Sequence, residues 1–262
     1  MNRRHLLKYS PAAVLGLKAC SPNDQSTPTP SAPPNPQYRP PAYTNPAVRN
    51  PNINLPSQFG NIEISHSRGP SSQPFVAMTF DDGPHPQNTP RLLDMLRQRN
   101  IKATFYVIGG SVDRYPHIVR RTVAEGHEIG NHTYTHRKLT TLGNSEVSRE
   151  LQRTNDAIAR ACGVRPRTMR PPYGALNQSQ RAYVYQQFGT PTILWSVDPQ
   201  DWRRPGASVV TSRILSGTNN GAIILAHDLH SSTIDAMPAT LDGLLRKGYK
   251  FITVSQMLAM KG

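Results

Sequence analysis

The sequence predicts an α/β domain in which helices cover a parallel β-sheet, and two patterns support this prediction. From Phe75 onward, short apolar runs alternate with amphipathic stretches of helical spacing. Strands that alternate with helices form parallel sheets with the helices outside. The polar residues that are able to catalyse reactions or bind metals directly follow the apolar runs. An open doubly wound sheet and a closed barrel both fit these patterns.

Seven apolar runs have the length and composition of strands. They are residues 75–80, 103–108, 127–131, 168–170, 192–197, 222–226 and 251–254. The amphipathic stretches predict helices over residues 89–99, 118–125, 145–161, 178–188, 208–216, 233–246 and 255–260. No Gly-x-Gly-x-x-Gly loop follows the first strand, which disfavours a dinucleotide-binding domain.

The N-terminal part of the chain differs from the rest in composition. Residues 21–57 are rich in Pro, Ser, Thr and Asn and contain few aliphatic side chains. Such a segment has too little apolar surface to pack a core. We therefore expect a disordered linker over residues 21–57 and a single catalytic domain over residues 58–262.

The first twenty residues have the pattern of an export signal. Arg3 and Arg4 precede a short apolar run that is too short to span a bilayer. Paired arginines are also typical of twin-arginine signals. Residues 17–20 resemble a bacterial lipobox, although Lys18 departs from that pattern. We expect an exported protein of the periplasm or cell envelope, in which Cys20 is either a lipid anchor or an ordinary residue of the signal.

The net charge of +14 favours contact with anionic polymers, either nucleic acid or an anionic glycan of the envelope. The sequence contains no zinc-finger spacing, no aromatic RNA-binding box and no cluster of basic residues. Nucleic acid is therefore not expected as a partner.

Two histidines and a pair of carboxylates follow two of the predicted strands. His132 and His136 are four residues apart, and Asp81 and Asp82 directly follow the first predicted strand. Read alone, the histidines are surface residues and the carboxylates belong to a turn. Two imidazoles and one carboxylate also form a catalytic metal set, which leaves positions for water and substrate. The sequence thus predicts a site for Zn²⁺ or a similar cation at Asp82, His132 and His136, with Asp81 as a base.

Three further segments place polar residues at predicted strand ends. Arg170 ends the fourth predicted strand, Asp201 follows the fifth and His227 follows the sixth. Arg170 is either a structural ion-pair partner or a group that keeps Asp81 ionised. His227 either begins a helix or protonates a leaving amine.

Five motifs in this order resemble those of the NodB-homology polysaccharide deacetylases, carbohydrate esterase family 4. They begin at Thr79, His132, Arg170, Asp198 and Leu225 and read TFDDGP, HTYTH, RPPYG, DPQDW and LAHD. The resemblance covers about residues 75–254, and it implies a distorted (β/α)₇ barrel. It also implies removal of N-acetyl groups from N-acetylglucosamine units of a glycan.

The resemblance implies a role for each motif residue. Asp81 is the general base, and Asp82, His132 and His136 hold one divalent metal, Zn²⁺ or alternatively Co²⁺, Ni²⁺ or Mn²⁺. Arg170 orients Asp81, and Asp201 supports His227 as the general acid. The backbone N–H of Tyr173 helps to form the oxyanion hole and its ring lines the groove. Trp202 and Leu225 form the pocket for the acetyl methyl group.

Two other functions remain open from the sequence. One is an O-acetyl esterase of the same family that acts on xylan or a similar glycan, and the other is a non-catalytic glycan-binding module. For an exported basic enzyme, the expected partner is an acetylated glycan such as peptidoglycan or chitin oligomers. Membrane contact is expected only through Cys20, and the protein is expected to be a monomer.

Removal of the Pro-rich segment should leave the domain intact. A truncated protein that begins at Gln58 should have the same melting temperature as the mature chain, because the removed segment lacks apolar side chains to pack. Differential scanning calorimetry measures both proteins. A melting temperature lowered by several degrees would show that the segment packs on the domain.

Overall fold

The computed structural model describes residues 63–260. The predicted export signal, Cys20 and the predicted linker over residues 21–57 lie outside this part of the chain. None of the helices in the described part is long and apolar enough to cross a membrane.

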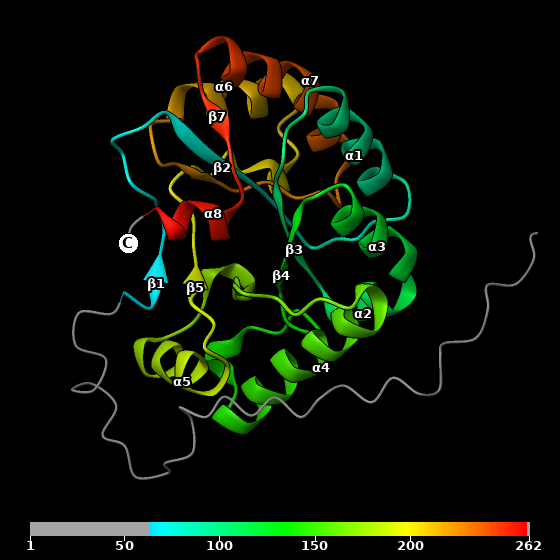
Figure 1. The fold of residues 1–262 in the computed structure, drawn as a ribbon, viewed down its shortest axis with the longest axis vertical. Coiled ribbons are helices and arrows are strands. Elements are labelled where there is room, and N and C mark those ends of the chain that lie inside the picture. Colours follow the sequence, from blue (N-terminus) through cyan, green and yellow to red (C-terminus); the bar gives the residue numbers. More distant parts are fainter. Residues whose placement is uncertain (1–62, 261–262) are drawn as a thin grey trace, which may run out of the picture. The chain divides into compact units, whose positions relative to one another are not determined.

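Short parallel strands form the centre of the domain (Figure 1). They are β1 (Ser65–His66), β2 (Phe75–Asp81), β3 (Thr104–Val107), β4 (Glu128–Asn131), β5 (Thr192–Ile193), β6 (Ile223–Ile224) and β7 (Lys250–Phe251). One sheet has the order β4-β3-β2-β6, β7 also pairs with β2, and β1 pairs with β5.

Isolated bridges close the strands into a barrel. Met169 bridges both Asn131 at the end of β4 and Thr192 of β5. Val197 bridges Ile224 of β6, which itself pairs with β2. The ring therefore runs from β2 through β3, β4, the segment around Met169, β5 and β6 back to β2. This agrees with the predicted distorted barrel. Most of its strands are short, and single bridges complete the ring where regular ladder hydrogen bonds are absent.

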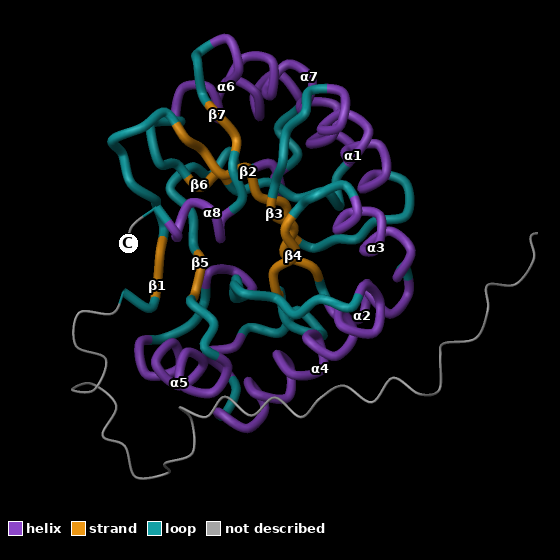
Figure 2. The backbone as a smooth tube through the Cα atoms, viewed as in Figure 1, coloured by secondary structure: helices purple, strands orange, loops and turns teal. Residues whose placement is uncertain are grey.

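All helices but α8 lie around the outside of this ring, and loops connect them to the strands (Figure 2). The helices are α1 (Asn88–Gln98), α2 (Gly109–Arg114), α3 (Pro116–Ala124), α4 (Asn144–Cys162), α5 (Gln178–Phe188), α6 (Ala207–Gly217), α7 (Ser231–Arg246) and α8 (Val254–Ala259). The main core lies where apolar side chains of the strands, such as Phe80 and Phe105, meet those of the helices, such as Leu92 and Leu241.

The amino-terminal end of the barrel is closed by α8. Val254 and Met257 of α8 share a buried cluster with Tyr106 of β3. Glu128, the first residue of β4, accepts hydrogen bonds from the N–H of Ser255 at 2.8 Å and from its hydroxyl at 2.7 Å. The carboxyl ends of the strands lie at the opposite end of the barrel.

The structure corrects several predicted boundaries. The predicted strand over residues 168–170 forms only the single bridges of Met169, and β1 and α2 were not predicted. The predicted strand over residues 251–254 ends early because Thr253 caps α8. The Thr253 hydroxyl accepts the N–H of Gln256 at 3.3 Å, and the Gln256 side chain accepts the N–H of Thr253 at 2.9 Å.

Candidate active site

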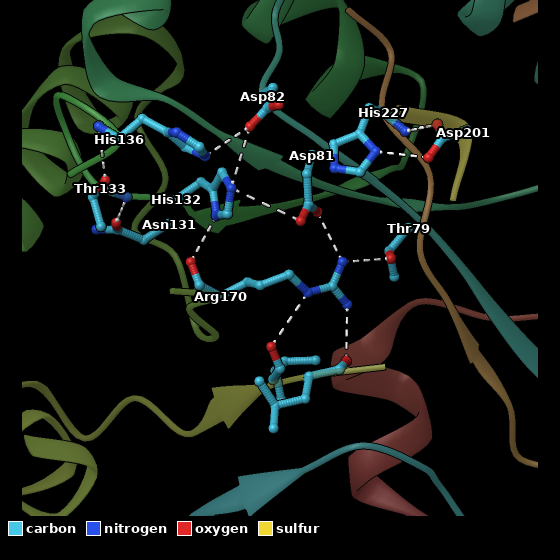
Figure 3. A network of polar contacts seen from close by, with 12 residues as sticks. Thr79, Asp81, Asp82, Asn131, His132, Thr133, His136, Arg170, Asp201 and His227 are labelled. Carbon is cyan, nitrogen blue, oxygen red and sulfur yellow. Dashed lines mark hydrogen bonds and ion pairs between the residues drawn. The ribbon is translucent and has the colours of Figure 1, made fainter. Parts of the chain in front are cut away.

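The residues singled out in the sequence meet at the carboxyl ends of the strands (Figure 3). Most of them surround a cleft of about 450 Å³. The cleft is lined by Asp81, Asp82, His132, His136, Tyr173, Trp195, Asp198, Trp202, Leu225 and His227. The two remaining predicted residues, Arg170 and Asp201, are fully buried and contact cleft residues from behind.

Asp82, His132 and His136 form a compact cluster at one side of the cleft. Oδ1 of Asp82 lies 3.3 Å from Nε2 of His132 and 3.1 Å from Nε2 of His136. One donor atom from each residue lies within 4.8 Å of the others. Nδ1 of His132 contacts the backbone oxygen of Arg170 at 2.7 Å, which turns Nε2 toward Asp82. The predicted ligand set therefore converges on one point.

A tight turn brings the two histidines together. The Asn131 side chain accepts the N–H of Thr133 at 2.8 Å, and the Thr133 hydroxyl accepts the N–H of His136 at 3.1 Å. Thr133 and His136 both have positive φ, at 65° and 59°. These bonds hold a conformation that L-residues rarely adopt. The turn places the rings of His132 and His136 with their centroids 5.0 Å apart.

The donor set fits a divalent cation. Oδ1 of Asp82 is buried and makes no hydrogen bond of ordinary geometry, although two imidazole nitrogens face it. Burial opposes ionisation of Asp82, but His132 and His136 outweigh burial and hold the pKa of this carboxyl well below its usual range. Burial likewise disfavours charged His132, but the carboxylates of Asp81 and Asp82 raise its pKa. The carboxylates of Asp81 and Asp82 thus favour positive charge at this cluster, either as protons on the imidazoles or as a cation bound in their place.

Arg170 fixes one oxygen of Asp81. Its Nη1 donates to Oδ1 of Asp81 at 2.8 Å and to the Thr79 hydroxyl at 2.7 Å. Its other nitrogens donate to the backbone oxygens of Ile193 at 3.2 Å and Leu194 at 3.0 Å. Arg170 has no exposed surface, so the ion pair with Asp81 is shielded from water.

The second oxygen of Asp81 faces the cluster of Asp82, His132 and His136. Oδ2 of Asp81 lies 3.8 Å from Nε2 of His132, while Oδ1 is held by Arg170. The Asp81 side chain is 4% exposed. The carboxyl therefore presents a single oxygen to the cleft beside the cluster of Asp82, His132 and His136.

His227 is held by Asp201. Nδ1 of His227 lies 2.8 Å from Oδ1 of Asp201, and the backbone N–H of His227 donates to Oδ2 at 2.8 Å. The Thr233 hydroxyl also donates to Oδ2 at 2.8 Å. Burial disfavours the charged imidazole, but the Asp201 carboxylate outweighs burial and raises the pKa of His227 to about 9. The ring is thus oriented and kept protonated near neutral pH.

Aromatic and apolar side chains complete the cleft. Tyr173 is 69% exposed and Trp202 is 48% exposed, whereas Leu225 is buried. The Tyr173 ring meets that of His136 edge-on with the centroids 5.0 Å apart. Sequence reasoning assigned no role to Trp195 and Asp198, which also line the cleft. Trp195 lay inside the predicted strand over residues 192–197, but the ladder of β5 ends at Ile193.

Comparison with known proteins supports the same family. A family model described as polysaccharide deacetylase matches residues 68–193. A peptidoglycan-N-acetylglucosamine deacetylase of Listeria monocytogenes is 42% identical over 186 residues, which are 71% of this chain and 39% of the relative. The matched part thus spans about two fifths of that relative's length. A chitooligosaccharide deacetylase of a Bradyrhizobium strain is 39% identical over 70% of this chain and 90% of its own length.

A solved structure has the same architecture. It is a peptidoglycan N-acetylglucosamine deacetylase in complex with 4-naphthalen-1-yl-N-oxidanyl-benzamide, and it is 35% identical with a TM-score of 0.72. The alignment covers 75% of this chain and 94% of the other. With this identity and coverage, the chain belongs to the polysaccharide deacetylase family.

Proposed function

We propose that the protein is a metal-dependent hydrolase that removes N-acetyl groups from N-acetylglucosamine residues of an envelope glycan. A metal-binding cluster, a carboxylate and a histidine–aspartate pair share one cleft, and this observation supports the proposal most directly. Hydrolysis of an amide needs activation of the carbonyl, a base for water and an acid for the leaving nitrogen. The products are acetate and a free glucosamine amine.

In this proposal, Asp82, His132 and His136 hold one divalent cation. Zn²⁺ fits two imidazoles and a carboxylate best, and Co²⁺, Ni²⁺ or Mn²⁺ accept the same donors. When bound, such a cation polarises the amide carbonyl and makes nearby water more acidic. The support comes from the convergence of the three donor atoms and from the Oδ1 atom of Asp82, which lacks an ordinary hydrogen bond.

Asp81 acts as the general base through Oδ2. Arg170 engages Oδ1, so that Oδ2 is the oxygen left to take a proton from the attacking water. The buried Arg170 therefore orients the base and does not itself touch the substrate.

His227 acts as the general acid through Nε2. Asp201 occupies Nδ1, which leaves Nε2 to deliver a proton to the leaving nitrogen. This step matters because an amide nitrogen leaves badly as an anion. The pKa of about 9 supports this role, since it keeps His227 protonated at neutral pH.

The remaining cleft residues bind the substrate. The backbone N–H of Tyr173 stabilises the oxyanion, and the exposed ring of Tyr173 stacks on a sugar. Trp202 and Leu225 contact the acetyl methyl group. The support is their position in the cleft lining and the positive φ of 61° at Tyr173, which turns its backbone sharply.

Two alternatives compete with this proposal. An O-acetyl esterase would use the same residues, but the alkoxide of an ester leaves more easily than an amide nitrogen. Ester hydrolysis would therefore depend less on His227. A non-catalytic glycan-binding module would not need a base, an acid and a metal-binding set in one cleft. Acetate release from an N-acetylglucosamine oligomer and from acetylated xylan, measured side by side, separates the three functions, because only the deacetylase acts on the first, the esterase acts on the second and the binding module acts on neither.

The proposed substrate is peptidoglycan, with chitin-like oligomers as the second candidate. The relatives carry the names of peptidoglycan and chitooligosaccharide deacetylases, and a basic chain suits an anionic wall polymer. We propose that the protein acts as a monomer outside the cytoplasm. Acetate release from purified peptidoglycan and from chitooligosaccharides, measured side by side, tests this choice; release from neither would contradict the proposed function.

Replacement of the two adjacent carboxylates should have different effects. Asp81→Asn should retain metal but lose a factor of ~10²–10⁴ in turnover, because an amide cannot accept the proton of water. Asp82→Asn should weaken metal binding, because a neutral group replaces an anionic ligand. Chelation should abolish wild-type activity, and excess metal should restore part of the activity of Asp82→Asn alone. Wild-type turnover by metal-loaded Asp81→Asn would refute the assignment of the base.

The pH profile should report on His227. The acid is active when protonated, so turnover should fall as the pH rises through the raised pKa of about 9. In Asp201→Asn the carboxylate that raises this pKa is absent, and the alkaline loss should begin at lower pH, toward the usual value of about 6.5. Profiles of kcat for both proteins test this, and unchanged alkaline limbs would argue against His227 as the acid.

Membrane attachment should depend on Cys20. If the export signal is processed at the lipobox-like segment, Cys20 carries a lipid and tethers the enzyme to the membrane. Labelling of cells with a fatty acid should then mark the wild-type protein but not the Cys20→Ser variant. Equal labelling of the two proteins, or labelling of neither, would exclude this anchor.

A further inference from the structure

The proposed mechanism leaves one buried carboxyl beside the site without a role. Asp228 directly follows His227 and has no exposed surface. Burial raises its pKa to about 7. Burying a carboxyl is costly unless its contacts compensate the lost hydration. Its contacts therefore indicate what the side chain does.

Asp228 is attached to the start of α1. The Thr89 hydroxyl donates a short hydrogen bond to Oδ2 of Asp228. The same hydroxyl accepts the N–H of His85 at 2.7 Å. His85 and Thr89 lie just after the turn that carries Asp82. A two-step hydrogen-bond chain thus connects the loop of His227 with the loop of the proposed metal ligand.

Gly83 packs directly against the Asp228 carboxyl. A Cβ atom at Gly83 would lie 2.6 Å from each oxygen of Asp228, so a larger side chain there would displace either the carboxyl or the turn. The carbonyl of Gly83 accepts the N–H of Ile108 at 2.9 Å. Gly83 is therefore held between Ile108 and Asp228, and it directly follows Asp82, whose φ is 74°. The turn that carries Asp82 thus packs against the Asp228 carboxyl.

A second connection binds the same two loops. The Asn88 side chain donates to the backbone oxygen of Leu229 at 3.1 Å and accepts from the Ser231 hydroxyl at 3.3 Å. The chain is thus held on both sides of Asp228: Asn88 binds Leu229 after it, and Asp201 binds His227 before it. Oδ1 of Asp228 has no hydrogen-bond partner among the described residues, and the backbone of Gly83 packs against the carboxyl that carries it.

We propose that Asp228 is a positioning residue that fixes the Asp82–Gly83 turn against the His227 loop. It thereby fixes the position of His227, the proposed acid, relative to Asp82 of the proposed metal-binding cluster. This inference rests on the proposed function. The general acid must deliver its proton within about 3 Å, and an error of about 1 Å in a reacting group can cost on the order of 100-fold in rate.

The first test compares single substitutions on two substrates. Asp228→Ala and Thr89→Val should lower kcat on an N-acetylglucosamine oligomer by on the order of tenfold or more, with KM nearly unchanged. The loss should be smaller on an aryl acetate, whose leaving group needs no proton. Asp228→Asn and Thr89→Ser should keep most of the activity, because each retains the group that makes the hydrogen bond.

Thr122→Val is the matched control for loss of a buried hydroxyl. Thr122 donates to the backbone oxygen of Ile118 at 2.9 Å within α3. This variant should lower the melting temperature as much as Thr89→Val does but leave the ratio of amide to aryl acetate turnover unchanged. If the losses in Asp228→Ala are equal on both substrates and follow its melting temperature, the residue is only structural and the inference fails.

The second test is a double-substitution cycle at the packed contact. Gly83→Ala places a methyl group against the carboxyl and should lower kcat on the oligomer. Adding Asp228→Ala removes the carboxyl and should restore part of this loss, so that the two effects are not additive. Additive losses would overturn the inference. A wild-type protein that is inactive on every acetylated glycan would instead reject the proposed function.

Discussion

A guanidinium group in the centre of the barrel constrains the arrangement of the site. Arg170 has no exposed surface, and a buried cation is tolerated only when its donors are fully paired. Its partners come from β2, through Thr79 and Asp81, and from the backbone at and after β5. Its guanidinium also stacks 4.3 Å above the Tyr106 ring of β3. Distant segments must therefore meet at Arg170, and they bring the cleft residues with them.

The two ends of the barrel have separate tasks. At the amino-terminal end, Glu128 and α8 close the interior with hydrogen bonds and apolar packing. At the carboxyl end, the backbone adopts positive φ at Asp82, His136 and Tyr173. Such conformations cost on the order of 1 kcal/mol or more each, and surrounding bonds must hold them. The closed end supplies the rigid scaffold on which this strained rim is built.

Much of the fold and the site could be predicted from local patterns. Six of the seven predicted strand regions overlap a strand, although the region 251–254 shares only Phe251 with β7, and polar residues lie at strand ends as predicted for Asp81, His132 and His227. The two-residue strand β1 was missed because so short a segment has no periodicity. Trp195 was assigned to a strand interior, because the sequence does not show that the hydrogen bonds between β5 and its neighbours end at Ile193. Thr89 and Asp228 are 139 positions apart, and no local signal connects them.

By itself, the sequence determined which side chains are available and at which strand ends they lie, because strand periodicity and turn residues act over a few positions. It therefore defined the cluster of Asp82, His132 and His136 and the basic, Pro-rich character of the chain. The tertiary structure alone decided which oxygen of Asp81 is free, which nitrogen of His227 is held, and that Gly83 rests on Asp228. These are contacts between distant segments, and only the closure of the barrel brings such segments within hydrogen-bond distance.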